Sequence, residues 1–264
     1  MKIIRFSGGL GNQMFMYALY KKLSLKFPVK ADLTFYKQNE LNRVFELEKK
    51  FNIKVDVATK EEILKAKDDL PLKKYRKNFG LIKKNNIIED IFKYNKFLFK
   101  KNYSYYYGYW QDERYFQDIK DIIKESFKFK CKESIIFKKN SVSILVRRTD
   151  FLTDKLLCDI ANLEYFEKAI EIIKKKIDNP VFYIFSDDLE WCRENLKPED
   201  EHHFVDTRNG MYLMSLCENN IIANSTFSWW SAWLNKNKNK IIICPEKYYN
   251  KGNKTPYLEE WIKI

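Results

Sequence analysis

The fold is decided by the stretch Val181-Phe182-Tyr183-Ile184-Phe185-Ser186-Asp187-Asp188, an unbroken apolar run that ends in polar residues. Such a run is typical of a strand buried on both faces of a parallel sheet. Its polar carboxyl end marks the edge where parallel sheets bind ligands. The stretch Ser141–Val146, followed by Arg147 and Arg148, repeats this pattern. We therefore expect two strands of a doubly wound α/β sheet.

Outward from these strands, short apolar runs alternate with amphipathic segments up to residue 244. In the helix expected at Leu163–Ile177, Phe166, Ile170 and Ile173 recur with helical spacing. The remaining helices are expected at Leu189–Leu196, Met211–Cys217 and Phe227–Asn235, and the remaining strands at His203–Val205, Ile221–Ala223 and Ile241–Cys244.

The N-terminus begins a second unit of the same kind, with a strand expected at Ile3–Phe6, a loop at Ser7–Gly11 and a helix from Met14 to Leu25. Further along, the pattern predicts helices at Lys60–Lys67 and Tyr115–Phe127 and a strand within Tyr103–Trp110. We divide the chain into two domains, residues 1–135 and 136–264, and expect a cleft between them.

The composition excludes several classes of protein. The 264 residues carry 49 Lys and Arg against 36 Asp and Glu, a net charge of +13, and 45% are hydrophobic, which is too many for a disordered chain. The longest apolar runs are far shorter than the roughly 20 residues that span a bilayer. Glycines near the N-terminus interrupt any signal-peptide core, so we expect a cytoplasmic protein.

The chain has few residues suited to a metal site. Its five cysteines lie far apart and include no Cys-x-x-Cys pair, which is typical of buried thiols in a reducing compartment. The two histidines, His202 and His203, cannot build a multi-histidine centre. No Asp-x-Asp spacing occurs, so we expect no metal, and carboxylates are the favoured general bases.

The positive charge has two interpretations. Because 41 of the 49 basic residues are lysine, a solvated lysine surface accounts for much of it. Runs such as Lys73–Lys77 also fit a polyanion, an anionic membrane face or a phosphorylated ligand. No helix-turn-helix, zinc-finger or RNP-like pattern is present, so we expect no nucleic-acid partner.

Three of the seven glycines, Gly8, Gly9 and Gly11, lie between the first strand and the first helix. Without Cβ atoms such a loop turns tightly and lets a ligand approach its N–H groups and the helix N-terminus. The amides of Asn12 and Gln13 can hydrogen-bond hydroxyls. The spacing lacks the last glycine of a dinucleotide-binding motif, and a tight turn without a ligand is the alternative.

Arg147 and Arg148 end a strand in a chain that uses lysine five times as often as arginine. The guanidinium fork binds phosphate through two hydrogen bonds and keeps its charge. A structural ion pair with Asp150 is the alternative, and one arginine can bind Asp150 while the other meets the ligand. Asp150 is also our first candidate for a general base, with Asp154 and Asp159 following in the same loop.

Two more polar clusters follow predicted strands. Of Asp187 and Asp188, one is expected to cap the next helix and the other to accept hydrogen bonds from a ribose or a base. After Ala223, hydroxyls at a helix N-terminus make a phosphate or nucleotide site, and an aromatic ring there can stack on a base. These residues are Asn224, Ser225, Thr226, Phe227 and Ser228, whereas Trp229, Trp230 and Trp233 are expected in the core.

Five motifs occur in order over nearly the whole chain: Phe6–Phe15, Gly108–Gln111 with Tyr115 and Phe116, Val146–Asp150, Phe185–Asp188, and Leu213–Ser215 running into Ile221–Leu234. Through them the chain resembles the bacterial α-1,2-fucosyltransferases, glycosyltransferase family 11. The glycine loop and the segment Asn224–Trp230 are the most specific of these motifs.

The resemblance implies a GT-B fold of two Rossmann-like domains facing a cleft, with the acceptor bound mainly by the N-terminal domain and GDP-fucose by the C-terminal domain. It implies inverting transfer to a galactosyl hydroxyl of a cell-surface glycan precursor, without metal or other cofactor. The match places Arg147, with Arg148, at the donor phosphates and Asp187 or Asp188 with Ser225–Ser228 at the nucleotide. The other residues expected to bind substrate are Gly9, Gly11, Asn12, Gln13, Trp110, Gln111 and Asn224.

Two positions depart from the family's pattern. Leu145 stands where the family usually has His, and Gly210 stands where an acidic residue usually precedes the Leu-Met-Ser helix. The departures leave open another GDP-sugar donor, or a non-catalytic protein that binds carbohydrate or polyanions. The basic surface also fits an enzyme that works on lipid-linked glycans at the inner face of the cytoplasmic membrane.

Overall fold

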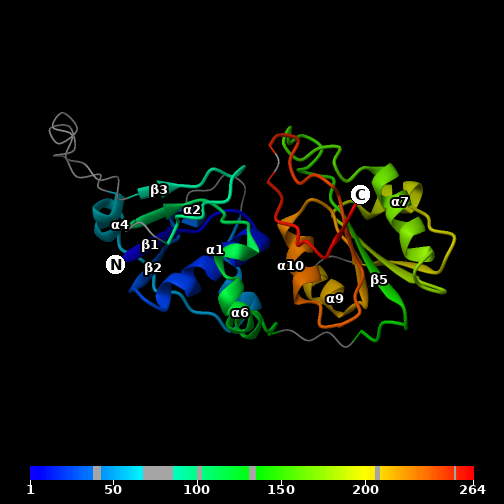
Figure 1. Cartoon of the computed structure of the whole chain (residues 1–264), viewed down its shortest axis with the longest axis horizontal. Helices are drawn as coiled ribbons and strands as arrows, with labels where there is room; N and C mark the ends of the chain where they lie inside the picture. Colours follow the sequence, from blue (N-terminus) through cyan, green and yellow to red (C-terminus); the bar gives the residue numbers. More distant parts are fainter. Residues whose placement is uncertain (38–42, 68–85, 100–102, 131–134, 206–208, 253) are drawn as a thin grey trace. The chain divides into compact units, whose positions relative to one another are not determined.

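The computed structural model describes residues 1–37, 43–67, 86–99, 103–130, 135–205, 209–252 and 254–264 (Figure 1). The chain forms two compact units, Met1–Lys130 and Cys131–Ile264, each with its own parallel sheet. The expected α/β class with two Rossmann-like units is confirmed. The basic run Lys73–Lys77 and Cys131 lie outside the described residues.

The first unit is built on a four-stranded sheet in the order β2-β1-β4-β3, with every pair parallel. The strands are β1 (Lys2–Arg5), β2 (Val29–Asp32), β3 (Asn86–Ile88) and β4 (Tyr105–Tyr107). β1 lies inside the sheet, and its Ile3 and Ile4 are fully buried. The sequence pattern did not predict β2 and β3, because each is short and carries polar residues.

The helix predicted at Lys60–Lys67 is confirmed, whereas the other helices of the first unit differ from the prediction in their bounds. The helices of this unit are α1 (Leu10–Ser24), α2 (Thr34–Lys37), α3 (Leu47–Lys50), α4 (Lys60–Lys67), the 3₁₀ turns η1 (Glu113–Tyr115) and η2 (Gln117–Ile119), and α6 (Lys120–Ser126). The start predicted for α1, Met14, was wrong, because Gln13 N already bonds Gly9 O (3.0 Å) and Gly11 lies in the first turn. The helical stretch predicted near Tyr115–Phe127 is present, but it is divided among η1, η2 and α6.

The second unit is built on a six-stranded parallel sheet in the order β10-β9-β8-β5-β6-β7. The strands are β5 (Ser141–Val146), β6 (Val181–Ser186), β7 (His202–Val205), β8 (Asn219–Ile221), β9 (Ile242–Cys244) and β10 (Ile262–Lys263). β5 pairs with β6 over its full length, from Ser141 opposite Val181 to Val146 opposite Ser186. Every residue of both strands is buried, as expected for mainly apolar strands inside a sheet.

Helices cover both faces of this sheet (Figure 1). On one face, α7 (Leu163–Lys174) and α8 (Leu189–Asn195) pack on Val142, Ile144 and Val146 of β5. On the other face, α9 (Gly210–Leu216) packs on Leu145 and contacts α10 (Thr226–Leu234). Among the described residues, no helix has the length and apolar character needed to span a bilayer.

Strand β8 begins two residues before the predicted start at Ile221, because two asparagines are buried in it. The Nδ2 group of Asn220 donates to Ser143 Oγ (2.7 Å) and Met214 O (2.9 Å), and its Oδ1 accepts from Asn235 Nδ2 (2.8 Å). Asn220 is fully buried, so these bonds replace its water contacts. A search for apolar runs misses such a strand.

Most of the described cysteines are buried thiols, as predicted. Cys192, Cys217 and Cys244 are buried and unpaired, and Cys158 is partly exposed. Burial raises the pKa of the Cys244 thiol to about 12. It also raises the pKa of Cys217, so both thiols stay protonated at neutral pH.

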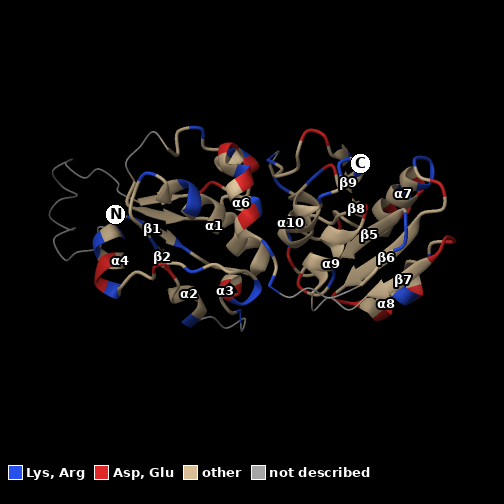
Figure 2. Ribbon diagram, turned by 90° about the horizontal axis from the view of Figure 1, so that it is seen from below, with Lys and Arg blue, Asp and Glu red and all other residues tan. Residues whose placement is uncertain are grey.

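Charged side chains are spread over both units. Figure 2 shows lysines and arginines on loops and helices of each unit, mixed with acidic residues on helices such as α4 and α6. This distribution fits the solvated lysine surface that the composition suggests.

We expect Asn220→Ala to lower the free energy of unfolding by about 2–4 kcal/mol, because it leaves buried groups of Ser143, Met214 and Asn235 without their partner. Urea denaturation followed by circular dichroism measures the change. The exposed Asn239→Ala is the matched control and should change stability by less than about 0.5 kcal/mol. Equal effects of the two substitutions would contradict this role of Asn220.

Candidate functional site

The strand order places a topological switch point beside β5. From β5 the chain continues to β6 and β7 on one side, and it then returns to β8 on the other side of β5. Ligands of doubly wound sheets bind outside the carboxyl ends of the strands at such a point. Two predicted clusters, Arg147–Asp150 after β5 and Asn224–Ser228 after β8, follow the strands that flank it.

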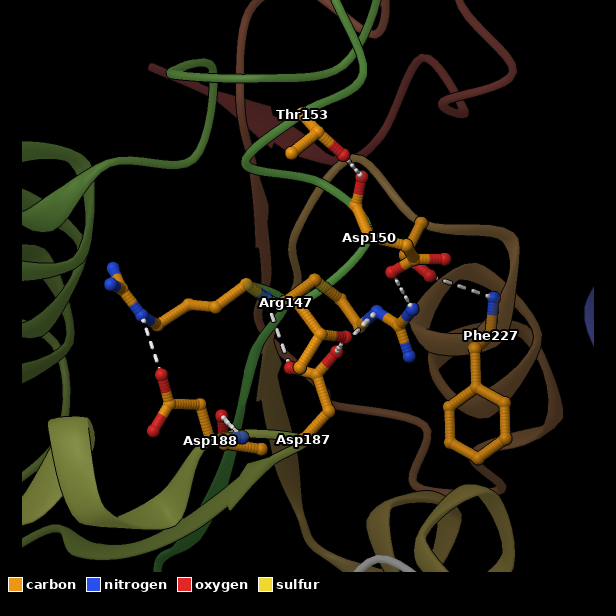
Figure 3. Close-up of polar contacts among 10 residues, drawn as sticks. Arg147, Asp150, Thr153, Asp187, Asp188 and Phe227 are labelled. Carbon is orange, nitrogen blue, oxygen red and sulfur yellow. Dashed lines mark hydrogen bonds and ion pairs between the residues drawn. The ribbon is translucent and has the colours of Figure 1, made fainter.

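Arg147 lies between two carboxylates (Figure 3). Its Nη2 donates to Asp150 Oδ1, and its Nε lies 3.5 Å from Asp187 Oδ2. The Nε atom is buried and has no hydrogen-bond partner among the described residues. The guanidinium carbon lies 5.1 Å from the ring centre of Phe151. The ion pair with Asp150 that the sequence suggests as an alternative is therefore present.

Arg148 is held against α8. Its Nε donates to Asp188 Oδ2 (3.1 Å), and its guanidinium carbon lies 3.9 Å from the ring centre of Trp191. At this distance a cation–π contact adds to the ion pair. Arg148 therefore contacts Asp188 and Trp191, which differ from the partners of Arg147.

Asp187 and Asp188 have different roles. Asp188 Oδ1 accepts from Trp191 N (3.1 Å) and so caps α8, as expected for one of the two. Asp187 Oδ1 accepts from Arg148 N (2.9 Å), and its Oδ2 accepts from Thr149 Oγ1 (2.6 Å). Asp187 therefore ties the end of β6 to the loop after β5.

A pocket of about 100 Å³ opens beside the arginine pair. Its walls are mainly apolar, and they come from the end of β5, the loop that follows it, the start of α7, and α8. The residues that line it include Val146, Arg147, Arg148, Phe151, Asp159, Phe166, Trp191 and Asn224. An apolar pocket with two cations can hold a molecule that combines an apolar face with an anionic group.

The cluster after β8 divides into anchoring and accessible residues. The Nδ2 group of Asn224 donates to Leu157 O (3.1 Å) and Tyr248 O (3.2 Å). Ser225 caps α10 by accepting from Phe227 N (3.3 Å), and the buried Ser228 Oγ donates to Ala223 O (3.2 Å). Thr226 and Phe227 are partly exposed, so the first turn of α10 is the accessible part of this cluster. The predicted core tryptophans of α10 are buried.

In the first unit, the glycine loop is fixed by Gln13. Its Nε2 donates to Gly8 O (3.1 Å) and Val44 O (2.9 Å), and its Oε1 accepts from Glu46 N (2.8 Å). Gly8 has φ +73°, and a Cβ there would lie 2.6 Å from Asn12 Nδ2. Gly8 is therefore required by the turn, and the predicted amide of Gln13 bonds the chain itself.

Asn12 and Gln111 meet at the carboxyl edge of this sheet. Gln111 Nε2 donates to Asn12 Oδ1 (2.9 Å), so the structure brings together two of the predicted substrate residues from distant parts of the sequence. Trp110 is different, because its side chain is fully buried against Tyr106 and Tyr115. Its indole contributes to the core of the unit.

A buried turn carries Trp110 and Gln111 to this edge. Glu89 Oε2 accepts from Tyr109 N (2.7 Å) and Trp110 N (2.8 Å), and Trp110 has φ +57°. A Cβ on Gly108 would lie 2.4 Å from the Glu89 Cβ, so glycine is needed there. Sequence reasoning missed Glu89, since an isolated acidic residue has no distinctive spacing.

Sequence reasoning also missed two arginines near the glycine loop. A Cβ on Gly9 would lie 3.4 Å from Arg43 Nη1. The guanidinium of Arg5, at the end of β1, lies 4.7 Å from the ring centre of Tyr107. The scarcity of arginine, which singled out the pair at 147 and 148, could have drawn attention to these residues too.

The two departures from the family's pattern lie on one side of the sheet. Leu145 packs with Leu213 and Met214 of α9, and Gly210 is the first residue of that helix. Phe227 is partly buried against the same cluster. Among the described residues, no group of three or more His, Cys, Asp and Glu side chains could hold a metal ion.

Known proteins resemble this chain over its whole length. The family described as Glycosyl transferase family 11 matches residues 1–264. The O-antigen biosynthesis glycosyltransferase WbnK of Escherichia coli is 33% identical, and the match covers 98% of each chain. An alpha-1,2-colitosyltransferase of Escherichia coli is 31% identical, with 99% of this chain and 98% of the relative covered.

More distant similarities extend beyond these bacterial relatives. Galactoside alpha-(1,2)-fucosyltransferase 2 of Rattus norvegicus is 29% identical over 47% of this chain and 39% of its own. Among solved structures, the ADP-heptose LPS heptosyltransferase II of E. coli matches with a TM-score of 0.48 and 14% identity, covering 100% of this chain and 90% of the other. Because the family match spans the whole sequence and two relatives align over nearly their full length, the chain belongs to glycosyl transferase family 11.

Proposed function

We propose that this glycosyltransferase moves L-fucose, or a closely related deoxy sugar, from its GDP-activated form to a galactosyl hydroxyl in α-1,2 linkage. The observation that carries the proposal is the position of Arg147 and the first turn of α10 after the two strands that flank the switch point. A guanidinium and the positive end of a helix dipole are both suited to a diphosphate.

The donor sugar is the least constrained part of the proposal. One full-length relative is named for colitose, which is L-fucose without its 3-hydroxyl, and the shorter matches are named for fucose. Two GDP-sugars are therefore leading candidates. Leu145 and Gly210, which depart from the family's pattern, also leave the choice of donor open to other GDP-sugars.

The acceptor is a galactose-terminated glycan in this proposal, and the relative named for O-antigen biosynthesis favours a precursor of a cell-surface polysaccharide. The amides of Asn12 and Gln111 support a role for the first unit in binding the acceptor. Amide groups both donate and accept hydrogen bonds, which suits sugar hydroxyls.

The reaction follows from the chemistry of the second unit. The acceptor oxygen attacks the anomeric carbon, the bond from that carbon to the phosphate breaks, and GDP leaves from the opposite face with inversion. Arg147 and the α10 N-terminus stabilise the charge that develops on the leaving diphosphate. A carboxylate accepts the hydroxyl proton, and Asp150 is the first candidate. In this scheme no metal ion takes part.

We expect purified protein to release GDP only from GDP-fucose or GDP-colitose, with a galactose-terminated oligosaccharide as acceptor and with EDTA present. GDP-mannose and UDP-galactose are the control donors. If the site bonds the 3-hydroxyl of fucose, the donor lacking it should react about 10⁴-fold more slowly. Loss of activity with EDTA would contradict metal independence. GDP binding without turnover over a wide acceptor panel would favour a non-catalytic binding protein.

We expect Arg147→Ala to lower kcat about 10²–10³-fold, since it removes a preorganised cation from the leaving group. Arg147→Lys should recover only part of this loss, because an ammonium lacks the planar fork. Steady-state kinetics with the preferred donor measures both. Arg193→Ala, an exposed arginine on α8, is the control, and an equal loss in that variant would contradict a specific role for Arg147.

We also propose a peripheral contact with the inner face of the cytoplasmic membrane. In the first unit, Phe97 and Phe99 are 47% and 43% exposed, and Phe27 is 42% exposed. Lysine ammonium groups lie near two of these rings, Lys96 at 5.2 Å from that of Phe97 and Lys22 at 5.9 Å from that of Phe99. Exposed aromatic rings beside lysines suit an anionic lipid surface.

We expect the protein to sediment with vesicles that contain phosphatidylglycerol and to be released by salt, because screening weakens the lysine contacts. The double variant Phe97→Ser, Phe99→Ser should bind these vesicles more weakly. Leu216→Ser, which alters an exposed apolar residue of α9, is the control. Unchanged binding of the double variant would rule out this surface.

A further inference from the structure

The two carboxylates beside Arg147 are held very differently. Asp187 is 19% exposed, and its two oxygens accept hydrogen bonds from Arg148 N and Thr149 Oγ1. Asp150 is 51% exposed and lies in the loop after β5, three residues beyond Arg147. Asp187 is therefore built into the sheet edge, whereas Asp150 lies on the more exposed side of Arg147.

The charges around Arg147 do not favour an additional anion. Two arginines and three aspartates are paired here, and they leave the cluster one unit negative. A diphosphate that approached this arrangement would meet a carboxylate already bonded to Nη2 of Arg147. Like charges this close repel, so the diphosphate and Asp150 compete for the same face of the guanidinium.

We infer that Asp150 holds the place of the donor diphosphate on Arg147 and is displaced when the donor binds, while Asp187 stays in position and keeps the guanidinium aimed. The inference rests on the proposed function, because it takes Arg147 as the phosphate-binding residue. It assigns Asp187 a positioning role, in place of the contact with ribose or base that the sequence suggested.

Displacement has a consequence for proton transfer. While Asp150 is bonded to Arg147, its Oδ1 atom accepts a hydrogen bond from the guanidinium. Once the diphosphate takes over the guanidinium, that carboxylate oxygen is released and can accept a hydrogen bond from the acceptor hydroxyl. The acceptor hydroxyl proton then passes to the Asp150 carboxylate as its oxygen bonds the anomeric carbon and GDP leaves. Donor binding thus prepares the base that the second substrate needs.

The test is GDP affinity, measured by titration calorimetry at constant salt. Asp150→Asn keeps the shape of the side chain but removes its charge, so it should tighten GDP binding by about three- to tenfold. Asp178→Asn is the matched control, since it removes the same charge from an exposed turn between α7 and β6, outside the pocket, and its effect should be less than about twofold. Asp187→Asn should weaken GDP binding, because Arg147 loses its fixed partner.

Two further measurements separate displacement from a merely structural effect. In an Arg147→Ala background, Asp150→Asn should no longer tighten GDP binding, since the competition needs the guanidinium. In steady-state kinetics, Asp150→Asn should lower both the KM for the donor and kcat, because it removes the competitor and the base together. A structural defect would raise KM.

The outcomes distinguish the inference from the function on which it rests. If wild-type protein binds GDP, and Asp150→Asn binds it equally or more weakly, Asp150 does not hold the place of the diphosphate. The inference is then overturned, while the proposed function stands. The inference is also overturned if Asp178→Asn tightens binding as much. If neither wild type nor any variant binds GDP, the proposed donor site is wrong and the inference falls with it.

Discussion

The register between β5 and β6 is the constraint on which the rest of the second unit depends. Val146 stands opposite Ser186, so the two strands end together and their next residues are neighbours. Arg147 and Arg148 thereby meet Asp187 and Asp188. A slip of one residue would offset the two strand ends and separate these charged residues from their partners. The apolar strand interiors therefore hold the charged residues in place.

The two units present different chemistry at the carboxyl edges of their sheets. In the second unit, pairs of opposite charge are joined across neighbouring loops, and each arginine has a carboxylate partner. In the first unit, the amides of Asn12 and Gln111 meet beside a glycine turn. Charged groups select phosphate, and neutral amides select hydroxyls. Both kinds of recognition are needed by an enzyme that joins an activated sugar to another sugar.

Sequence patterns predicted much of the second unit because β5, β6 and β9 are mainly apolar. β5 was predicted to the residue, and the pattern located α7, α8 and α10 within a few residues. The failures have a common physical cause: β2, β3 and β8 contain polar residues whose environment is set by distant partners. Asn220 lies in a strand because Ser143, Met214 and Asn235 satisfy its amide, and no local pattern reports that. In the site, the sequence suggested the ion pair with Asp150 and the cap on α8, but not the bonds that join Asp187 and Asp188 to the arginine pair.

The cation–π contact between Arg148 and Trp191 places an indole directly beneath the charged cluster. The other five tryptophans, Trp110, Trp229, Trp230, Trp233 and Trp261, are buried in cores, so their surroundings change little when the surface is occupied. Trp191 is only partly buried, and the excited state of an indole responds to charges close to its ring. The protein therefore carries an intrinsic optical reporter at the arginine pair, whose fluorescence can follow in real time any rearrangement of the charges around it.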